Sequence, residues 1–246
     1  MNKRLVFAAL TTLSFSAVPA IPCDGKAVVK TNPSTGNDER LCSVWDGHDY
    51  EIEWSEKTTG WSAPIRLTDN LSDDVAPDVA FAADGTTGVV WREGGGGGSV
   101  HYRERALVDG IWTWRSGSAL VSDGTSDASA PRIRFDGAGA AWIGWHEYNP
   151  DGSVSVMSGV GDSPTPWPMA FENSPVGITE ASGDLQLDMN AEAGEQWIVW
   201  VESSDDLAYA EWNDVSGGWG PVLLEPYSGP GDVDEGKERV REEVLP

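Results

Sequence analysis

Carboxylates stand at repeated positions along this chain. Three glutamates each follow a tryptophan by two residues: Glu93, Glu147 and Glu202. Asp46 directly follows a fourth tryptophan, Trp45. Carboxylates gathered on one surface can act as general acid and base in glycoside hydrolysis, or they can supply the six to eight oxygen ligands that Ca²⁺ takes. The third interpretation is an acidic surface that is simply solvated.

Two pairs of adjacent aspartates extend this acidic set. Asp73–Asp74 and Asp205–Asp206 each place two carboxylates next to each other in the chain. Like charges held together favour a bound cation. We expect these four residues to be the ligands if the protein binds Ca²⁺, the one cofactor that the sequence suggests. The sequence contains no complete EF-hand loop, so that pattern does not locate a site.

Four other side chains are candidates for ligand contacts beside Asp46 and the three glutamates: Arg92, Arg132, Trp112 and Tyr148. The two arginines are expected near one shared face. Trp112 is flanked by loop residues, so its ring could stack on a sugar. The alternative for each tryptophan of the chain is burial between packed β-sheets, and packing is the more common role.

Several kinds of chemistry have no support in the sequence. The net charge is −24, which argues against nucleic acid and anionic lipid, because both are bound through lysine and arginine. The three histidines, His48, His101 and His146, have no partner at metal-ligand spacing. No Gly-x-Ser-x-Gly elbow is present, and the glycine run 94–98 is not followed by the Lys-Ser/Thr of a phosphate loop.

Tryptophans reveal the elements that must position these residues. One series is spaced by 53, 53 and 52 residues: Trp61, Trp114, Trp167 and Trp219. A second series is spaced by 46, 54 and 55 residues: Trp45, Trp91, Trp145 and Trp200. Two series in phase over the same four units indicate a repeat of about 50 residues.

Each unit reads as four short strands. Alternating apolar residues, β-branched and aromatic side chains, and Gly or Asn-Asp turns predict hairpins, and no long stretch has helical periodicity. We therefore predict an all-β fold, a β-propeller-like array of four four-stranded antiparallel blades. The blades are expected at about 25–70, 71–126, 127–178 and 179–229, within a domain of residues 21–229. Residues 230–246 form a charged tail.

The repeat resembles that of sialidase-like, Asp-box-type β-propellers and of exported bacterial proteins that share this blade. The resemblance rests on the run 61–68, on Ala76–Ala80, and on Asp84–Gly85 followed by Val89–Trp91. It implies a propeller fold. The family Asp box, Ser-x-Asp-x-Gly-x-x-Trp, is incomplete in this chain, because the segment 55–61 keeps the serine, glycine and tryptophan but lacks the aspartate.

The same family has six blades, an arginine triad for the substrate carboxylate, a Tyr–Glu nucleophile pair and an aspartate acid/base. This chain shows four blades, and its first and fourth blades supply no arginine that matches Arg92 and Arg132. The family's catalytic residues are therefore not transferred to it. An array completed by a partner chain is one alternative to a closed four-blade ring.

The N-terminus predicts export. Lys3 and Arg4 precede a mostly apolar stretch, 5–18, that is too short to span a bilayer, and Ala20 offers a cleavage site. Residues 1–20 are thus expected to be a signal peptide, and the mature chain to be secreted or periplasmic without a membrane anchor. Export favours a disulfide between Cys23 and Cys42, with two buried free thiols as the alternative.

The sequence therefore predicts an exported, non-catalytic binding module. Its acidic loop face would recognise a glycan or an extracellular protein, with Ca²⁺ as an assisting ion. One alternative is a degenerate sialidase-like glycoside hydrolase that uses the loop carboxylates. The other is a structural repeat protein whose exposed blade edges pair between chains.

Overall fold

The computed structural model describes most of the chain between Cys23 and residue 225. The described residues are 23, 27–95, 98–124, 127–161, 171–179, 187–190, 196–201, 207–213 and 216–225. All of their regular elements are β-strands, which confirms the all-β class. None of these residues belongs to a helix with the length and apolar character needed to cross a membrane. The proposed signal peptide and the tail 230–246 lie outside the described residues.

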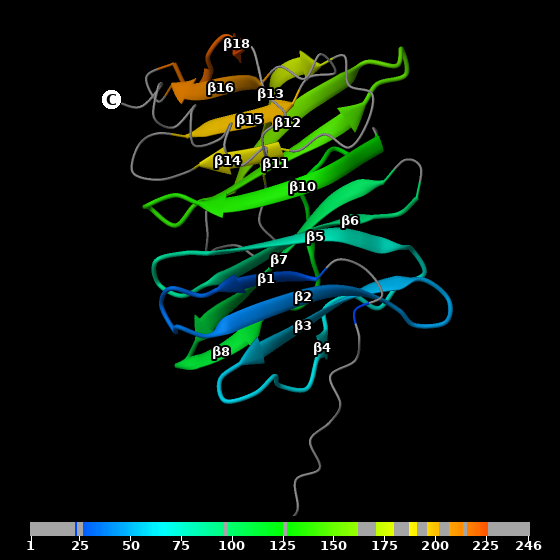
Figure 1. Cartoon of the computed structure of the whole chain (residues 1–246), viewed down its shortest axis with the longest axis vertical. Coiled ribbons are helices and arrows are strands. Elements are labelled where there is room, and N and C mark those ends of the chain that lie inside the picture. Colours follow the sequence, from blue (N-terminus) through cyan, green and yellow to red (C-terminus); the bar gives the residue numbers. More distant parts are fainter. Residues whose placement is uncertain are drawn as a thin grey trace, which may run out of the picture.

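The strands form four antiparallel sheets, each built from consecutive strands (Figure 1). Blade 1 contains β1 (Val28–Thr31), β2 (Asp38–Trp45), β3 (Tyr50–Lys57) and β4 (Ile65–Arg66). Blade 2 contains β5 (Asp74–Phe81), β6 (Thr87–Glu93), β7 (Ser99–Val108), β8 (Ile111–Trp114) and β9 (Ala119–Leu120).

The other two sheets repeat this plan. Blade 3 contains β10 (Asp127–Phe135), β11 (Ala141–Tyr148), β12 (Val154–Gly161) and β13 (Glu172–Thr179). Blade 4 contains β14 (Leu187–Asn190), β15 (Trp197–Val201), β16 (Leu207–Asn213), β17 (Gly218–Trp219) and β18 (Leu223–Glu225). In blades 2 and 4 two short strands share the fourth position along the third strand. The prediction of four propeller-type blades is confirmed.

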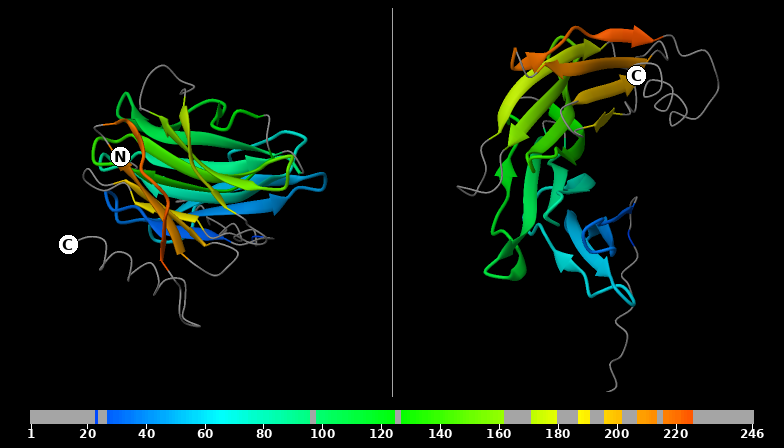
Figure 2. Two further views of the ribbon diagram at one scale, coloured as in Figure 1. Left: turned by 90° about the horizontal axis from the view of Figure 1, so that it is seen from above. Right: turned by 90° about the vertical axis from the view of Figure 1, so that its left-hand side faces the viewer.

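The blades stack in chain order along an arc (Figure 2). Blade 1 and blade 4 lie at its opposite ends, and the first strands β1, β5, β10 and β14 follow one another along one side (Figures 1 and 2). Three hydrophobic clusters join successive blades: Leu41 and Trp54 pack with Val89 of blade 2, Tyr102 packs with Ile143 of blade 3, and the third joins blades 3 and 4. Each blade is therefore stabilised mainly by its neighbours, as expected for a repeat architecture.

Three of the four tryptophans spaced by 46, 54 and 55 residues fill these contacts. Trp91, Trp145 and Trp200 are fully buried between sheets, which agrees with the packing interpretation. Trp45, the remaining member of that series, is 48% exposed. It is the last residue of β2, whereas Trp91 and Trp145 lie inside their strands. The irregular spacing of 46 residues thus reflects a different position in the blade.

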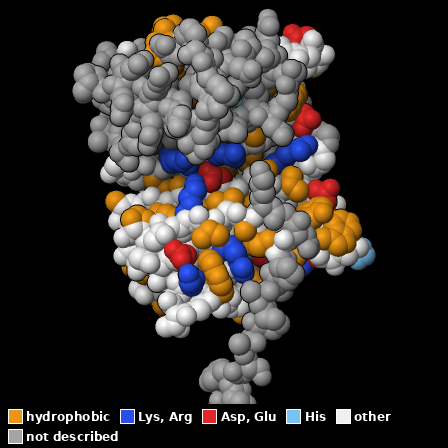
Figure 3. All heavy atoms as spheres, viewed as in Figure 1, with side chains coloured by type: hydrophobic (Ala, Val, Ile, Leu, Met, Phe, Trp, Pro, Cys, Tyr) orange, Lys and Arg blue, Asp and Glu red, His pale blue; other side chains and the backbone are white. Residues whose placement is uncertain are grey.

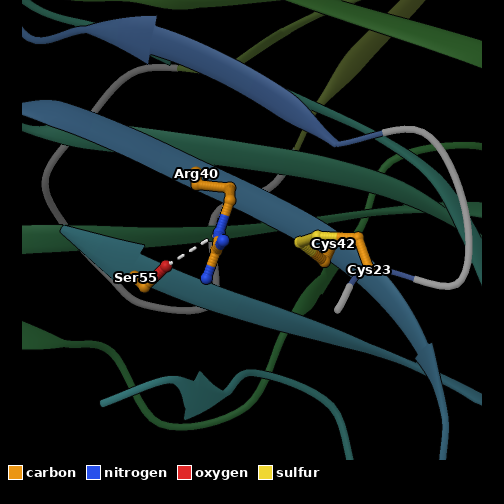
Figure 4. Close-up of a disulfide and its surroundings, with 4 residues drawn as sticks. All are labelled: Cys23, Arg40, Cys42 and Ser55. Carbon is orange, nitrogen blue, oxygen red and sulfur yellow. Dashed lines mark hydrogen bonds between the residues drawn. A yellow bond between two sulfur atoms is a disulfide. The ribbon is translucent and has the colours of Figure 1, made fainter. Parts of the chain in front are cut away.

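A disulfide links Cys23 to Cys42, with the two Cα atoms 5.4 Å apart (Figure 4). Cys42 lies on β2 and is buried, so the bond joins the segment before β1 to the body of blade 1. Beside it, Arg40 donates its Nε hydrogen to Ser55 Oγ across β2 and β3, at 3.2 Å (Figure 4). Arg40 also stacks on Trp61, 4.6 Å from the ring centroid.

Candidate binding site on the hairpin rim

One edge of the arc collects the loops that join second to third strands and those that join successive blades. Strands alternate in direction, so both loop classes end on the same side, on the right in Figure 1. We call this edge the hairpin rim. Its described loop residues are 46–49, 67–73, 94–95, 98, 121–124 and 149–153. The strand ends that face these loops carry most of the sequence-predicted site residues.

The tip of the β2–β3 hairpin is a tight turn built by Asp46 and Gly47. Gly47 has a φ of +110°, a conformation that glycine adopts without steric cost. Asp46 donates its backbone N–H to the carbonyl of Asp49 at 3.1 Å, and its Oδ1 accepts the N–H of His48 at 2.9 Å. Its Oδ2 accepts a hydrogen bond from Arg66 at 3.0 Å. The N–H of His48, together with Asp49's N–H and Arg66, keeps the pKa of Asp46 below its usual value.

Two further acids stand beside this turn. Asp49 is 5% exposed, and neither oxygen of its carboxylate has a hydrogen-bond partner. Burial, followed by the charges of Glu51 and Asp46, raises the pKa of Asp49. Glu51 is fully buried and well paired: Oε2 accepts the hydroxyl of Thr68 at 2.5 Å, and Oε1 accepts the N–H of Asn70 at 3.0 Å.

One carboxylate oxygen from each of Asp46, Asp49 and Glu51 lies within 4.8 Å of the other two. Among the described histidines, cysteines and acids, this is the group of three with the spacing of metal ligands. The sequence had suggested Asp46 as a ligand contact. Asp49 and Glu51 were missed, although the pattern Asp-Gly-x-Asp-x-Glu around a turn was a signal.

The predicted metal ligands Asp73 and Asp74 lie next to this group but differ from each other. Asp73 Oδ1 accepts the N–H of Tyr50 at 3.2 Å, which ties the inter-blade loop to the hairpin. Asp74 is fully buried and accepts a hydrogen bond from Asn70 at 3.0 Å. Burial raises the pKa of Asp74 to about 7. A hydrogen bond from Thr68 opposes this shift, and the nearby charges of Glu93 and Glu51 add to it. Asp205 and Asp206 lie outside the described residues.

Glu93 and Glu147 occupy corresponding places in blades 2 and 3 but have different partners. Glu93 ends β6, and its Oε2 lies 3.4 Å from His101 Nε2. Burial lowers the pKa of His101 although Glu93 opposes the effect. Glu147 is 7% exposed and accepts the indole N–H of Trp145 at 3.0 Å. Burial raises the pKa of Glu147. Glu202 lies outside the described residues.

The described arginines are engaged within the protein. Arg92 pairs with Asp127 at 3.4 Å, and Arg132 donates to the carbonyl of Pro131 at 2.9 Å. The others pair with acids, donate to backbone carbonyls or stack on tryptophan: Arg40, Arg66, Arg103, Arg105, Arg115 and Arg134. Each described arginine thus has a partner within the protein.

Trp112 lies away from the hairpin rim. It belongs to β8, at the end of blade 2 where β6 begins rather than ends. Its ring is close enough that a Cβ on Gly85 would meet it at 3.0 Å and Ser34 of blade 1 at 3.3 Å. This ring therefore packs against the turn at Gly85, which also lies beside Ser34 of blade 1.

Exposed aromatic side chains mark the rim itself. Trp45 ends β2 and Tyr148 ends β11, and they are 48% and 42% exposed. Trp45 makes an edge contact with Tyr50, with ring centroids 5.3 Å apart. Figure 3 shows hydrophobic side chains gathered over the tip of this hairpin, at the right-hand edge. Nearby Leu71, in the loop between blades 1 and 2, is 93% exposed.

Comparison with solved structures shows which fold this is. A Hadza microbial sialidase superposes with a TM-score of 0.58 and 15% identity, covering 83% of this chain and 46% of the other. An ulvan lyase of a new polysaccharide lyase family, bound to -[GlcA(1-4)Rha3S]-, gives a TM-score of 0.57 and 9% identity over 81% and 54% of the two chains. A Trypanosoma rangeli sialidase in complex with the inhibitor DANA gives 0.52 and 8% identity over 79% and 37%.

The chain has a sialidase-like, propeller-type fold. It spans about half the length of the Hadza sialidase and of the ulvan lyase, and 37% of the Trypanosoma rangeli sialidase. Identities of 15% and below establish the fold alone. No protein-family model and no curated protein matches the sequence.

Proposed function

We propose that this protein is an exported glycan-binding module that holds sugar on the hairpin rim. The observation that carries the proposal is the pair of exposed aromatic residues, Trp45 and Tyr148, at the ends of corresponding strands in blades 1 and 3. Trp45 precedes Asp46 in the chain, and Tyr148 stands opposite the partly exposed Asp127 in the register of β10 and β11. An aromatic ring offers an apolar face to the C–H side of a sugar, and carboxylate oxygens accept hydrogen bonds from its hydroxyls.

The rim is built to hold such a ring in place. Trp45 is braced by its edge contact with Tyr50, and both residues flank the turn that Asp46 closes. The two rings sit in different blades, so the rim offers two positions along its length. This arrangement suits an extended oligosaccharide better than a single monosaccharide.

Charge indicates which sugars would bind. The described arginines are engaged by acids, carbonyls and tryptophan, while Asp46 follows Trp45 in the chain and Asp127 stands opposite Tyr148. A sugar carboxylate or sulfate would meet repulsion there, which costs more near a protein surface than in bulk water. We infer that the ligand is a neutral glycan. The same engagement of the arginines favours binding over sialidase-type catalysis.

A panel of soluble oligosaccharides tests the proposal. Neutral and anionic glycans are titrated calorimetrically into the protein, and each mixture is then examined chromatographically for cleavage. The account predicts saturable binding of at least one neutral oligosaccharide with no new products. Cleavage that is lost in Glu147→Gln would make the protein an enzyme, and binding confined to anionic sugars would contradict the assigned ligand class.

A further inference from the structure

The turn of the β2–β3 hairpin concentrates negative charge without neutralising it. Asp46, Asp49 and Glu51 bring carboxylate oxygens within 4.8 Å of one another. Like charges at this separation repel more strongly near a protein surface than in bulk water. A folded protein retains such a group when something offsets the repulsion.

Two of the three carboxylates have evident partners. Asp46 is bound by Arg66 and by the N–H of His48. Glu51 accepts hydrogen bonds from Thr68 and Asn70. These contacts fix the directions of both side chains and leave them beside the third acid.

Asp49 lacks any such partner. It is 5% exposed, and both of its carboxylate oxygens are buried without a hydrogen bond. A buried ionised carboxylate costs several kcal/mol unless it is paired or bound to a metal. One of its oxygens lies within 4.8 Å of an oxygen of Asp46 and an oxygen of Glu51, so a compensating charge would have to stand among the three carboxylates.

We propose that Asp46, Asp49 and Glu51 bind one Ca²⁺ ion at the tip of the β2–β3 hairpin. Carboxylate oxygens are the ligands that this hard cation prefers, and each can coordinate through one or both oxygens, with water completing the shell. Three carboxylates and the guanidinium of Arg66 together carry a charge of −2, which a divalent cation balances. The site differs from the ligand set expected from the sequence, because Asp73 and Asp74 lie outside the group of three.

The position of the ion would link it to the rim aromatics. Trp45 immediately precedes Asp46, and Tyr50 lies between Asp49 and Glu51. A bound cation would therefore hold the backbone of both rings. The inference nevertheless stands apart from glycan binding, since it rests on carboxylate geometry alone and is tested without sugar.

The test is a titration of Ca²⁺ alone into the full chain after treatment with a chelator, at fixed ionic strength. The expected result is one saturable site per chain and a rise in melting temperature, because a ligand that binds only the folded state stabilises it. Terbium, which replaces Ca²⁺ in oxygen sites, should luminesce on excitation of the adjacent indole of Trp45. Heats no larger than those of an equal ionic strength of NaCl would overturn the proposal.

Matched variants locate the site. Asp49→Asn is expected to weaken Ca²⁺ binding at least about tenfold and to raise the melting temperature of the calcium-free protein, because it removes an uncompensated charge. Asp109→Asn removes the same charge from an exposed side chain in the β7–β8 turn, at the end of blade 2 opposite the rim, and should change the affinity less than about threefold. Equal losses in the two variants would mean diffuse screening rather than a site. Asp46→Asn serves as a second ligand variant if Asp49→Asn does not fold.

Discussion

Lys30 and Asp78 form an ion pair between blades 1 and 2, with Nζ 2.7 Å from Oδ1. The same carboxylate reaches blade 3, where its Oδ2 accepts the N–H of Ile133 at 3.1 Å and lies 3.4 Å from Arg134. Asp78 is 5% exposed. One side chain on the first strand of blade 2 thus connects the first strands of three consecutive blades.

Asp78→Ala should destabilise the protein by about 1–3 kcal/mol, because the buried N–H of Ile133 loses its acceptor. Lys30 and Arg134 are partly exposed and can turn to water, which limits the loss. Urea denaturation measures the difference. Asp38→Ala breaks a more exposed ion pair, with Lys57, and should destabilise the protein less than Asp78→Ala does. Equal costs would show that Asp78 does not link the blades.

Gly88 tests the packing of blade 2 against blade 3. A Cβ at this position would lie 2.7 Å from Phe135 Cζ and 2.8 Å from Ile133 Cδ1. Gly88→Ala should therefore destabilise the protein by about 1–3 kcal/mol through overpacking. Gly60→Ala is the control, because a Cβ there meets nothing within 4 Å. A neutral Gly88→Ala would mean that the two blades are not packed as described.

The disulfide should contribute measurably to stability. Cys23 and Cys42 are separated by 19 residues, and closing a loop of that length stabilises a protein by about 3 kcal/mol in the chain-entropy model. Cys23→Ser should lower the melting temperature, and the reducing agent that lowers that of the wild type should have no further effect on the variant. A variant that still responds to reductant would contradict the pairing.

His146 predicts a specific pH dependence. Burial, followed by the positive charge of Arg132, lowers the pKa of His146 to about 4. The unfolded chain therefore binds this proton at higher pH than the folded protein, so stability is lost as the pH falls from about 6.5 to about 4. The contribution is up to about 3 kcal/mol. His146→Leu should flatten this part of the stability curve, measured by urea denaturation at pH 7.5 and pH 4.5; an unchanged slope would contradict the assignment.

The fold could be predicted because tryptophan spacing reports blade packing directly. Trp91, Trp145 and Trp200 recur at nearly constant intervals since each fills the same contact between sheets. Trp45 lies only 46 residues before Trp91, and the sequence interpretation places it in the same series although it is the last residue of its strand. Periodicity identifies a strand, but it does not show where the strand stops.

The site was harder to predict because it depends on contacts between loops. Glu93 and Glu147 were expected on one rim from their position after a tryptophan, and Glu93 is the last residue of β6 while Glu147 is the last but one of β11. The partners of Glu51, however, are Thr68 and Asn70, seventeen and nineteen residues away. Only the register of β3 with the following loop shows that the Glu51 carboxylate receives hydrogen bonds while the Asp49 carboxylate receives none.

The most direct test of glycan binding at the hairpin rim is the affinity of rim variants for a neutral oligosaccharide that binds the wild type. Trp45→Ala and Tyr148→Ala should each weaken binding at least about tenfold, as loss of an aromatic contact at a binding surface does. Ile111→Ala, which removes an exposed apolar side chain of β8 at the end of blade 2 opposite the rim, should leave the affinity unchanged. If both aromatic variants bind as tightly as the wild type, the sugar is held elsewhere and the account is wrong.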